Sequence, residues 1–549
     1  MQFFSELLIT LLLLFFLITT LSGIGYISAS IFNLNKTEVI YYYTFFGLAI
    51  SLTLLEIINF FFPINFYISL PFFLIGTLFF FITKSKIFLL CFKKINYKFF
   101  IFLLLSIFWF IKSKDTITNF DSGVYHLSNI KWISEFPLIG GLANLITHFA
   151  NNSSWFMFVS LVNFSNIIEN SYAISGLVMI VISICLIIKC RNNIPYPNIL
   201  LPIFVASIIF NTYRLSSPSP DLAVNIFTLI IFFLLVELLY LSPTKDIKIR
   251  IYLIISLCIS LINIKFSGAP FACIVLIFLF FYCKAKISFK QLLTFIIFIL
   301  IMLIPHLIRG YYISGYPFFP LTIGSSFFNP EWKMNLNFVE SHSQLISCWA
   351  KGIVNNCGDN LSINWIKNWI LNTRLEILFY LLFSLVLFFL SFIKLNSNLR
   401  KILFLSALPL LSLLIWFYKA PNPRFSISLI MIFFGSSICL FIAAYNIKLK
   451  FINDKKKIIP IIFLTLLISN LRFSSTTLEN FNYILNNGSF PIPKPQYSKQ
   501  NINTNLNVNI PENKQCYNIE LPCILFLEKD LYFIKNNNGF PEIYFGKYK

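Results

Sequence analysis

The chain has 549 residues, of which 58% are hydrophobic and 11% are charged, and its mean hydropathy is +0.79. Soluble domains carry roughly 25% charged residues, so this composition excludes a soluble globular protein and predicts a polytopic membrane protein. The formal net charge is +21. Because lysines between apolar runs commonly set membrane orientation, we expect a lipid bilayer as partner and no nucleic acid.

Apolar runs of bilayer length recur along the chain. A transmembrane helix needs roughly 17 to 25 apolar residues. About fourteen such runs are present, at residues 3–29, 39–62, 66–82, 98–112, 172–188, 195–212, 222–241, 250–264, 268–283, 291–311, 374–393, 402–418, 425–445 and 458–472. The sequence therefore predicts an all-α polytopic membrane protein. Residues 155–168 are apolar but interrupted by Asn163, Ser165 and Asn166, so we expect an interfacial or re-entrant helix there.

Lysine and arginine predict the orientation. If 155–168 does not cross, the basic loops all fall on one side, at residues 30–38, 83–97, 189–194, 242–250, 284–290, 394–401 and 446–457. The positive-inside rule makes that side cytoplasmic. The other side then receives residues 113–171, 213–221, 265–267, 312–373, 419–424 and the tail from 473. We therefore expect a multi-pass protein of the bacterial inner membrane with both termini external.

The same patterns predict three units. Residues 1–97 contain three apolar runs followed by the most basic loop, which predicts an accessory N-terminal unit. Residues 98–472 form the transmembrane core, with external loops 113–171 and 312–373. Residues 473–549 are rich in Asn, Pro and Lys and then alternate polar with apolar residues, which predicts a linker and a small external element.

The cysteines offer a separate test of the orientation. Of 11 cysteines, the four in segments predicted to be external form two close pairs, Cys348 with Cys357 and Cys516 with Cys523. An oxidising compartment favours disulfides at such pairs. The alternative is that loop cysteines lie close in sequence by chance.

The first long external loop contains the strongest candidate for catalysis. Asp121 is followed by Ser122 and Gly123, and His126 lies five residues on. If a helix starts at Ser122, Asp121 and His126 reach one site, with Asp121 as base or metal ligand. The alternative is that Asp121 only caps that helix. The four histidines lack the spacing of a zinc site.

Basic residues at external helix ends are the candidates for binding a phosphate group. Arginine at such positions runs against the positive-inside bias, and bidentate hydrogen bonds to phosphate explain its presence. The candidates are Arg214, Asp221, Lys265, Arg309 and Arg424. Two alternatives remain: Asp221 caps the next helix, and Lys265 extends its amine to the membrane interface.

These residues and their surroundings resemble the GT-C superfamily of membrane glycosyltransferases. They resemble more closely an uncharacterised group of bacterial polytopic proteins similar to its distant members. The resemblance runs from about Asn119 to Phe425, through FDSGVYHLSNIKWI, GGLANL, NNSSWF, SPSPDL, the Lys265 turn, RGYYISGYPFFP and APNPRF. It implies a GT-C-like fold and a polyprenyl-phosphate-linked sugar as donor. It also implies an acidic residue in the first external loop as base or metal-binding group, here Asp121.

The resulting hypothesis is a glycosyltransferase for cell-surface polysaccharide assembly. It moves a sugar from the lipid-phosphate carrier to a glycan or lipid acceptor on the external face, and a divalent metal ion is the one cofactor that this hypothesis allows. An O-antigen polymerase-like protein is a variant with the same donor class. A transporter or flippase for lipid-linked saccharides and a non-catalytic assembly protein are the alternatives. A transporter needs charges at mid-membrane or on both faces, whereas these candidates lie on one face, which favours the enzyme.

Overall fold

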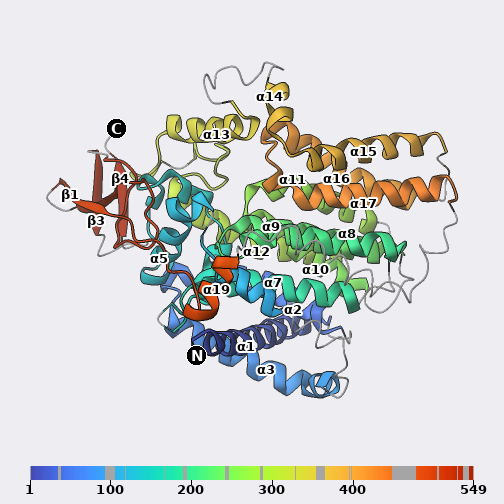
Figure 1. Cartoon of the computed structure of the whole chain (residues 1–549), viewed down its shortest axis with the longest axis horizontal. Helices are drawn as coiled ribbons and strands as arrows, with labels where there is room; N and C mark the ends of the chain where they lie inside the picture. Colours follow the sequence, from blue (N-terminus) through green and yellow to red (C-terminus); the bar gives the residue numbers. More distant parts are fainter. Residues whose placement is uncertain are drawn as a thin grey trace.

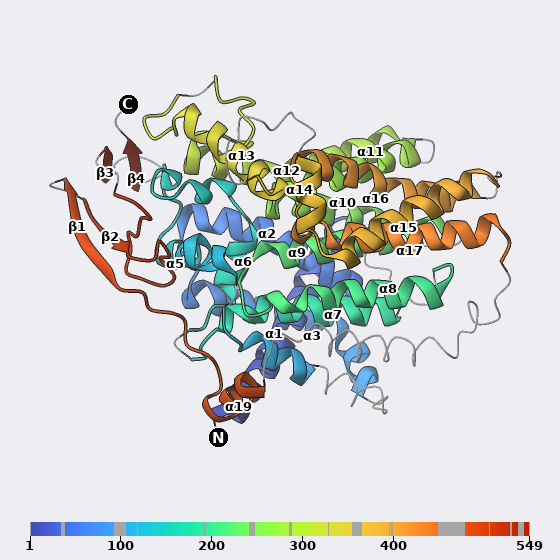
Figure 2. The ribbon, with the colours of Figure 1, turned by 45° about the horizontal axis from the view of Figure 1, so that its top comes forward.

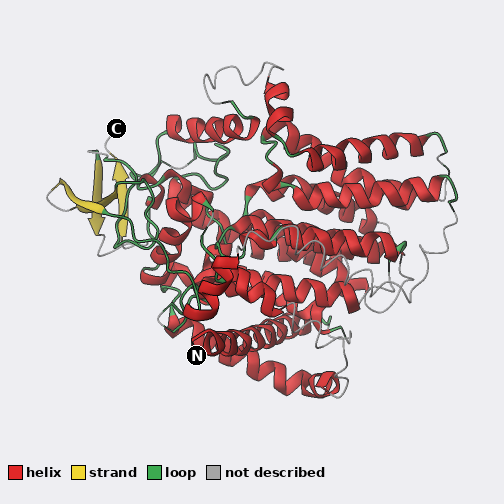
Figure 3. Cartoon of the chain, in the orientation of Figure 1, coloured by secondary structure: helices red, strands yellow, loops and turns green. Residues whose placement is uncertain are grey.

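Apolar α-helices make up most of the chain, because only intrahelical hydrogen bonds satisfy an isolated backbone segment in lipid. The structure is a computed structural model (Figures 1 and 3). It describes residues 2–34, 39–92, 106–117, 119–165, 167–189, 194–240, 247–284, 288–327, 329–353, 365–394, 396, 399–447, 478–503, 506–527, 530–535 and 543–547.

Twelve of the described helices run roughly side by side as a bundle (Figures 1 and 2). They are α1 (Gln2–Ile31), α2 (Ile40–Phe61), α3 (Phe66–Phe92), α7 (Ile174–Lys189), α8 (Pro197–Phe210), α9 (Pro220–Tyr240), α10 (Ile247–Ile264), α11 (Ala269–Lys284), α12 (Phe289–Ser314), α15 (Leu375–Phe392), α16 (Arg400–Lys419) and α17 (Ile427–Ala444).

Ten of the described helices are long and apolar enough to cross a membrane, so the protein is a multi-pass membrane protein. The predicted runs 195–212 and 268–283 correspond to α8 and α11, which have only 14 and 16 residues. The predicted runs at 98–112 and 458–472 lie partly or wholly outside the described residues. Within the segment 155–168, for which we expect an interfacial or re-entrant helix, the structure has a seven-residue helix, α6 (Trp155–Leu161). It is too short to span and is entirely buried in protein.

The bundle has a protein-packed centre and an apolar rim. In α7, α9 and α10, between 83% and 94% of the most apolar window is buried, whereas in α3, α12 and α15 only 22–28% is buried. The exposed side chains of these outer helices are mainly Phe, Leu and Ile, as expected for surfaces that face lipid chains.

Close backbone packing joins the N-terminal helices to the bundle. A Cβ on Gly25 would lie 1.8 Å from the Tyr43 carbonyl oxygen, and a Cβ on Gly47 would lie 1.8 Å from the Leu21 carbonyl oxygen. Small residues of this kind let membrane helices approach closely. Helix α2 also packs on α10 and α12, and α1 packs on α7. The boundary predicted at residue 97 stays a prediction.

The segments predicted to be external gather at one end of the bundle. Figure 1 shows the start of α1, the short helices and the strands at the left end, opposite the turn between α15 and α16. The short helices there are α5 (Leu127–Glu135), α13 (Leu336–Lys351), α14 (Trp365–Asn372) and α19 (Leu478–Asn487). The tail adds two antiparallel hairpins, β1 (Tyr497–Asn503) with β2 (Leu506–Pro511), and β3 (Leu531–Lys535) with β4 (Ile543–Lys547). We call this end the loop-rich end.

Candidate functional site

A π-helical turn follows Asp121 at the loop-rich end. The turn spans Ser122–His126, continues into α5, and is buried along its whole length. Turns of this type are rare and occur frequently at functional sites. The Asp121 side chain makes no capping hydrogen bond. The alternative in which Asp121 only caps a helix therefore does not describe this structure.

Arg424 bridges two acidic residues from distant parts of the chain. It lies in the short helical turn Pro423–Phe425 between α16 and α17. Its Nη2 donates a hydrogen bond to Oδ2 of Asp121 at 2.8 Å, and its Nε lies 3.6 Å from Oδ2 of Asp221. Burial lowers the pKa of Arg424, but the carboxylates of Asp221 and Asp121 more than offset this, so its pKa is raised. Arg424 is therefore a permanent cation held between two anions.

Lys265 pairs with the second of these acids. Its Nζ lies 2.5 Å from Oδ1 of Asp221, and it also lies 4.5 Å from the centre of the Phe425 ring. The pKa of Lys265 is lowered from its ordinary value, because burial lowers it by more than the Asp221 carboxylate raises it. Asp221 is in the first turn of α9, where the helix dipole favours a negative charge. The Lys265 amine is thus held by Asp221 within the protein and does not extend away from it.

Arg214 completes the set through the backbone of Arg424. Its Nη1 donates to the carbonyl oxygen of Arg424 at 3.1 Å. Asn225, which the sequence did not single out, donates to the same carbonyl at 3.1 Å and to the carbonyl of Asp221 at 2.9 Å. We call Asp121, Arg214, Asp221, Lys265 and Arg424 the charged cluster. All five were candidates from the sequence, and four separate segments supply them.

His126 lies next to this cluster but is shut off from solvent. The side chain is 1% exposed, and its Nδ1 is 3.2 Å from the hydroxyl of Ser122, which in turn contacts the hydroxyl of Ser217 at 2.5 Å. Burial lowers the pKa of His126 to about 3. The imidazole is therefore neutral at physiological pH and a weak base. A role in holding the π-helical turn fits this environment better than proton transfer.

Arg309 lies apart from the charged cluster. Its Nη1 donates to Oδ1 of Asn59 at 2.5 Å, and one turn away in α12 the Nδ1 of His306 is 2.7 Å from Oε1 of Glu56. Nothing in the described residues connects Arg309 to the charged cluster by a hydrogen bond or ion pair. The expectation that it binds phosphate beside Arg424 has no geometric support here, because this side of α12 faces α2.

A cavity of about 560 Å³ opens beside Arg424. Its wall combines arginine and tryptophan side chains with apolar residues at the loop-rich ends of three bundle helices. The side chains that line it include Phe210 of α8, Arg214, Trp349, Arg374, Ile377 of α15, Arg424 and Ile427 of α17. Arg424 thus lines the cavity and also contacts Asp121. The guanidinium also lies 4.7 Å from the centre of the Trp349 ring.

Sequence reasoning missed charged residues inside the spans. Glu56 of α2 and Glu237 of α9 are both fully buried. Glu237 accepts a hydrogen bond from the Tyr42 hydroxyl at 2.7 Å and lies 3.9 Å from Nε of Arg250. Lone acids within apolar runs were the available signal, because such residues are rare and often functional in membrane helices.

The charged cluster does not fit a divalent metal ion. Carboxylate oxygens are the ligands such an ion prefers, but Asp121 and Asp221 already contact Arg424 and Lys265. No group of three or more His, Cys, Asp or Glu side chains that could hold a metal occurs in the described part of the chain. We therefore derive no metal-dependent step.

A family model covers most of the chain. The model of a domain of unknown function, DUF8201, matches residues 7–431. The chain belongs to this family. The matched region includes most of α1, the whole of α2 and α3, and the whole charged cluster. No curated protein and no solved structure matches the chain.

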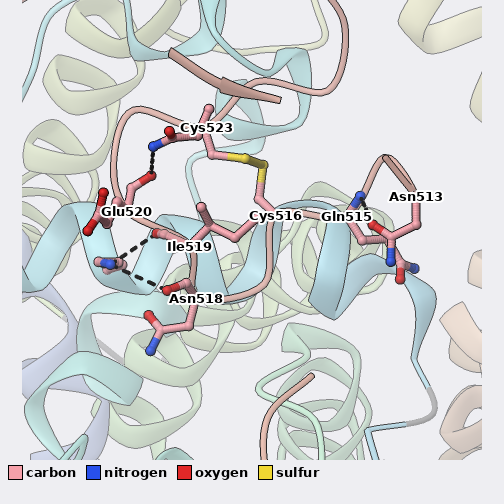
Figure 4. The surroundings of a disulfide bond; sticks show 9 residues. Asn513, Gln515, Cys516, Asn518, Ile519, Glu520 and Cys523 are labelled. Atoms are coloured by element: carbon pink, nitrogen blue, oxygen red, sulfur yellow. Dashed lines mark hydrogen bonds between the residues drawn. A yellow bond between two sulfur atoms is a disulfide. The ribbon is translucent and has the colours of Figure 1, made fainter. Parts of the chain in front are cut away.

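The DUF8201 match ends before the C-terminal tail, which packs on α5 and the π-helical turn before it. Cys516 and Cys523 form a disulfide, at a pair that the sequence predicts. Beside it, Lys131 of α5 donates to the carbonyl oxygens of Asn518 and Ile519 (Figure 4). Cys348 is also disulfide-bonded, and its predicted partner, Cys357, lies outside the described residues.

The tail also contacts the π-helical turn. The backbone N–H of Tyr517 donates to the carbonyl of Gly123 at 2.8 Å. A Cβ on Gly123 would lie 2.8 Å from Cζ of the Tyr517 ring. Only glycine fits this contact without a shift of the ring. The tail therefore holds the turn that follows Asp121.

Proposed function

We propose that the protein is a membrane glycosyltransferase that moves a sugar from a lipid-phosphate carrier to a glycan or lipid acceptor. The observation that carries the proposal is the convergence of Asp121, Arg424, Asp221 and Lys265 on one site at the loop-rich end. A carboxylate beside fixed cations is the arrangement needed to accept a proton and to stabilise a departing phosphate.

Asp121 is the proposed base. Its Oδ2 is held by Arg424, whereas its Oδ1 makes no hydrogen bond among the described residues, and the side chain is 23% exposed. Oδ1 takes the proton of an acceptor hydroxyl as that oxygen attacks the anomeric carbon of the donor sugar. The bond between that carbon and the carrier phosphate breaks, and its electron pair leaves with the phosphate oxygen.

The cations stabilise the charge that develops on the phosphate. Arg424 and Lys265 are held by Asp121 and Asp221 before substrate arrives, so little reorganisation is needed at the moment of reaction. A general base contributes about 10²- to 10⁴-fold to rate, which sets the loss expected when Asp121 can no longer accept a proton.

The proposed setting is the external face of a bacterial inner membrane, in the assembly of a cell-surface polysaccharide. The basic loops support this orientation through the positive-inside rule. The gathering of the predicted external segments at the loop-rich end is consistent with it (Figure 1), as is the disulfide in the tail, which an oxidising compartment favours.

The test is a complementation experiment in the native host. A deletion strain carrying Asp121→Asn should accumulate the lipid-linked sugar and lack its glycan, whereas a strain carrying Glu135→Gln should behave as wild type. Glu135 is a matched control, because it is an acid in the same loop with a side chain 46% exposed. Immunoblots of membranes check equal expression. Wild-type glycan levels in the Asp121→Asn strain would reject the proposed mechanism.

A second candidate, a transporter for lipid-linked saccharides, has one observation in its favour. Helices α9 and α10 carry charge near both ends, since Glu237 and Arg250 pair near the ends opposite Asp221 and Lys265. Charges on both sides of a bundle are what a transport path needs. If the protein is a transporter, deletion strains accumulate the lipid-linked saccharide on the cytoplasmic face, chemically complete.

A further inference from the structure

The cavity at the loop-rich end is lined by the ends of helices and not by their middles. Phe210 is the last residue of α8, Ile377 is in the first turn of α15, and Ile427 is the first residue of α17. The rest of the wall comes from α13, α14 and the turns that follow α8, α14 and α16. A charged, water-soluble ligand therefore reaches the cavity without entering the apolar middle of the bundle. The cavity volume of about 560 Å³ is typical of small-molecule sites.

Positive charge exceeds negative charge on the wall of the cavity. Three separate segments contribute Arg214, Arg374 and Arg424. Glu376 is the only acid among the described residues that line it. The excess remains when the whole charged cluster is included, because that cluster adds one lysine and two aspartates to these four residues. The cavity therefore favours an anionic ligand.

Two of these arginines have hydrogen-bond donors to spare. Arg374 is exposed and makes no hydrogen bond or ion pair within the described part of the chain. Arg214 is buried, donates to the carbonyl oxygen of Arg424 at 3.1 Å, and interacts electrostatically with Asp221 at longer range. A guanidinium group has five N–H donors, so both arginines can donate further hydrogen bonds to an anionic ligand.

Aromatic rings lie beside the other faces of the arginines. The Tyr213 ring centre is 4.7 Å from the guanidinium carbon of Arg214, and the Trp349 ring centre is 4.7 Å from that of Arg424. Both rings line the cavity, and the two residues are 43% and 52% exposed. Sugar rings present apolar faces that pack on aromatic rings, and carboxylates on sugars form paired hydrogen bonds with arginine. The wall offers these two kinds of contact side by side.

We propose that the cavity binds an acidic saccharide of the uronate type, and that this saccharide is the acceptor. Its role as acceptor rests on the proposed function. Arg214, Arg374 and Arg424 spread positive charge over the wall, which suits carboxylates on successive sugar rings better than one compact anion. Arg424 also contacts Asp121, so the acceptor binds next to the residue that holds the proposed base.

Isothermal titration with the full-length protein in detergent tests the binding. The probes are the disaccharides of glucuronate, galacturonate and mannuronate, each compared with its methyl ester, which keeps the sugar rings and removes the charge. Succinate supplies two carboxylates without a sugar. At least one disaccharide should bind about tenfold or more tightly than its methyl ester and than succinate, as expected for one charge-assisted hydrogen bond. Equal binding of the methyl esters or of succinate, or no binding of any disaccharide, would overturn the inference.

Variants at exposed positions locate the site. Arg374→Gln removes one cation from the wall and should weaken binding about tenfold. Lys367→Gln is the matched control, because Lys367 is an exposed cation of α14 that does not line the cavity, and binding should not change. Trp349→Leu removes an aromatic face and should also weaken binding. Unchanged binding in Arg374→Gln or in Trp349→Leu, or equal weakening in Lys367→Gln, would overturn the assignment to this cavity.

Binding and transfer are measured separately, so the two proposals fail in different ways. Binding that depends on Arg374, by a protein that transfers no sugar, would leave the saccharide site standing and reject the transferase. Sugar transfer by a protein that binds none of the acidic disaccharides would leave the transferase standing and overturn the acidic saccharide.

Discussion

Arg424 and Asp121 are 303 positions apart in the chain, and the guanidinium of one donates a 2.8 Å hydrogen bond to the carboxylate of the other. Both side chains are about three-quarters buried. The contact joins the turn before α17 to the residue that precedes the π-helical turn Ser122–His126. It therefore fixes the proposed base next to an arginine that also lines the cavity.

Replacing Arg424 should weaken the fold and the activity together. Arg424→Gln removes the bridge between Asp121 and Asp221, and hydrogen bonds to charged groups contribute about 1.5–3 kcal/mol each. We expect a lower melting temperature in detergent and at least a tenfold loss of glycan product. Arg424→Lys keeps the positive charge but cannot contact both carboxylates in the same way. Its melting temperature and glycan product should lie between those of the wild type and Arg424→Gln. Lys419→Gln is the control, and an unchanged melting temperature for Arg424→Gln would contradict the bridging role.

Acid should destabilise the protein through two buried histidines. Burial lowers the pKa of both His126 and His342 to about 3, whereas an unfolded histidine has a pKa of about 6.5. The stability this contributes is present above pH 6.5 and is lost as the pH falls toward 3, because only the unfolded chain takes up the protons. At pH 5 the loss is about 2 kcal/mol for each histidine.

Melting temperatures at pH 7 and pH 5 measure this effect. His342→Gln should reduce the drop between the two pH values, whatever it does to stability at pH 7. An equal drop in melting temperature in the wild type and in His342→Gln would contradict this account, because it would show that unfolding at pH 5 does not involve proton uptake by His342.

The contact between the tail and the π-helical turn gives a double-mutant cycle. Gly123→Ala places a methyl group against the Tyr517 ring, and overpacking of this kind costs about 1–3 kcal/mol. In the double variant Gly123→Ala, Tyr517→Leu the smaller side chain makes room, so the two changes should cost less than their sum. Strictly additive losses of stability would contradict a direct contact in the folded protein.

The orientation has its own test. Reporter fusions after Lys94, Lys290 and Lys457 should report a cytoplasmic position, and a fusion after Asn501 an external one. Peptide mapping without reduction should find Cys516 joined to Cys523, and Cys348 to Cys357. A cytoplasmic reading after Asn501 would invert the proposed orientation.

The members of the charged cluster could be predicted from the sequence, but the contacts between them could not. Asp221, Lys265 and Arg424 stand out as charged residues at ends of apolar runs, and Asp121 stands out as an acid beside Ser122 and Gly123 in a long loop. Their contacts depend on how the ends of α9, α10 and α17 pack together, and no local pattern encodes this. Arg309 shows the same limit, because its position at a helix end says nothing about which side of α12 it faces.

Other features were visible in the sequence but not used, or not visible at all. Glu56 and Glu237 interrupt apolar runs, and membrane helices rarely tolerate such acids without a reason. Gly123 and Tyr517 could not be paired, because a glycine in a loop gives no indication of what packs on it. The helices themselves were predictable, since lipid requires long apolar stretches with internally satisfied hydrogen bonds.

The most direct test of the proposed function is a conversion assay in liposomes. Purified protein is reconstituted with lipid extract from the deletion strain, and the lipid-linked saccharide and any new product are followed by mass spectrometry over time. We predict that the wild type and Glu135→Gln consume the saccharide and form a longer glycan or a glycosylated lipid. Asp121→Asn should do so at least about 100-fold more slowly, the lower end of what a general base contributes. Equal rates for Asp121→Asn, or movement of the saccharide across the bilayer by the wild type without chemical change, would contradict the transferase.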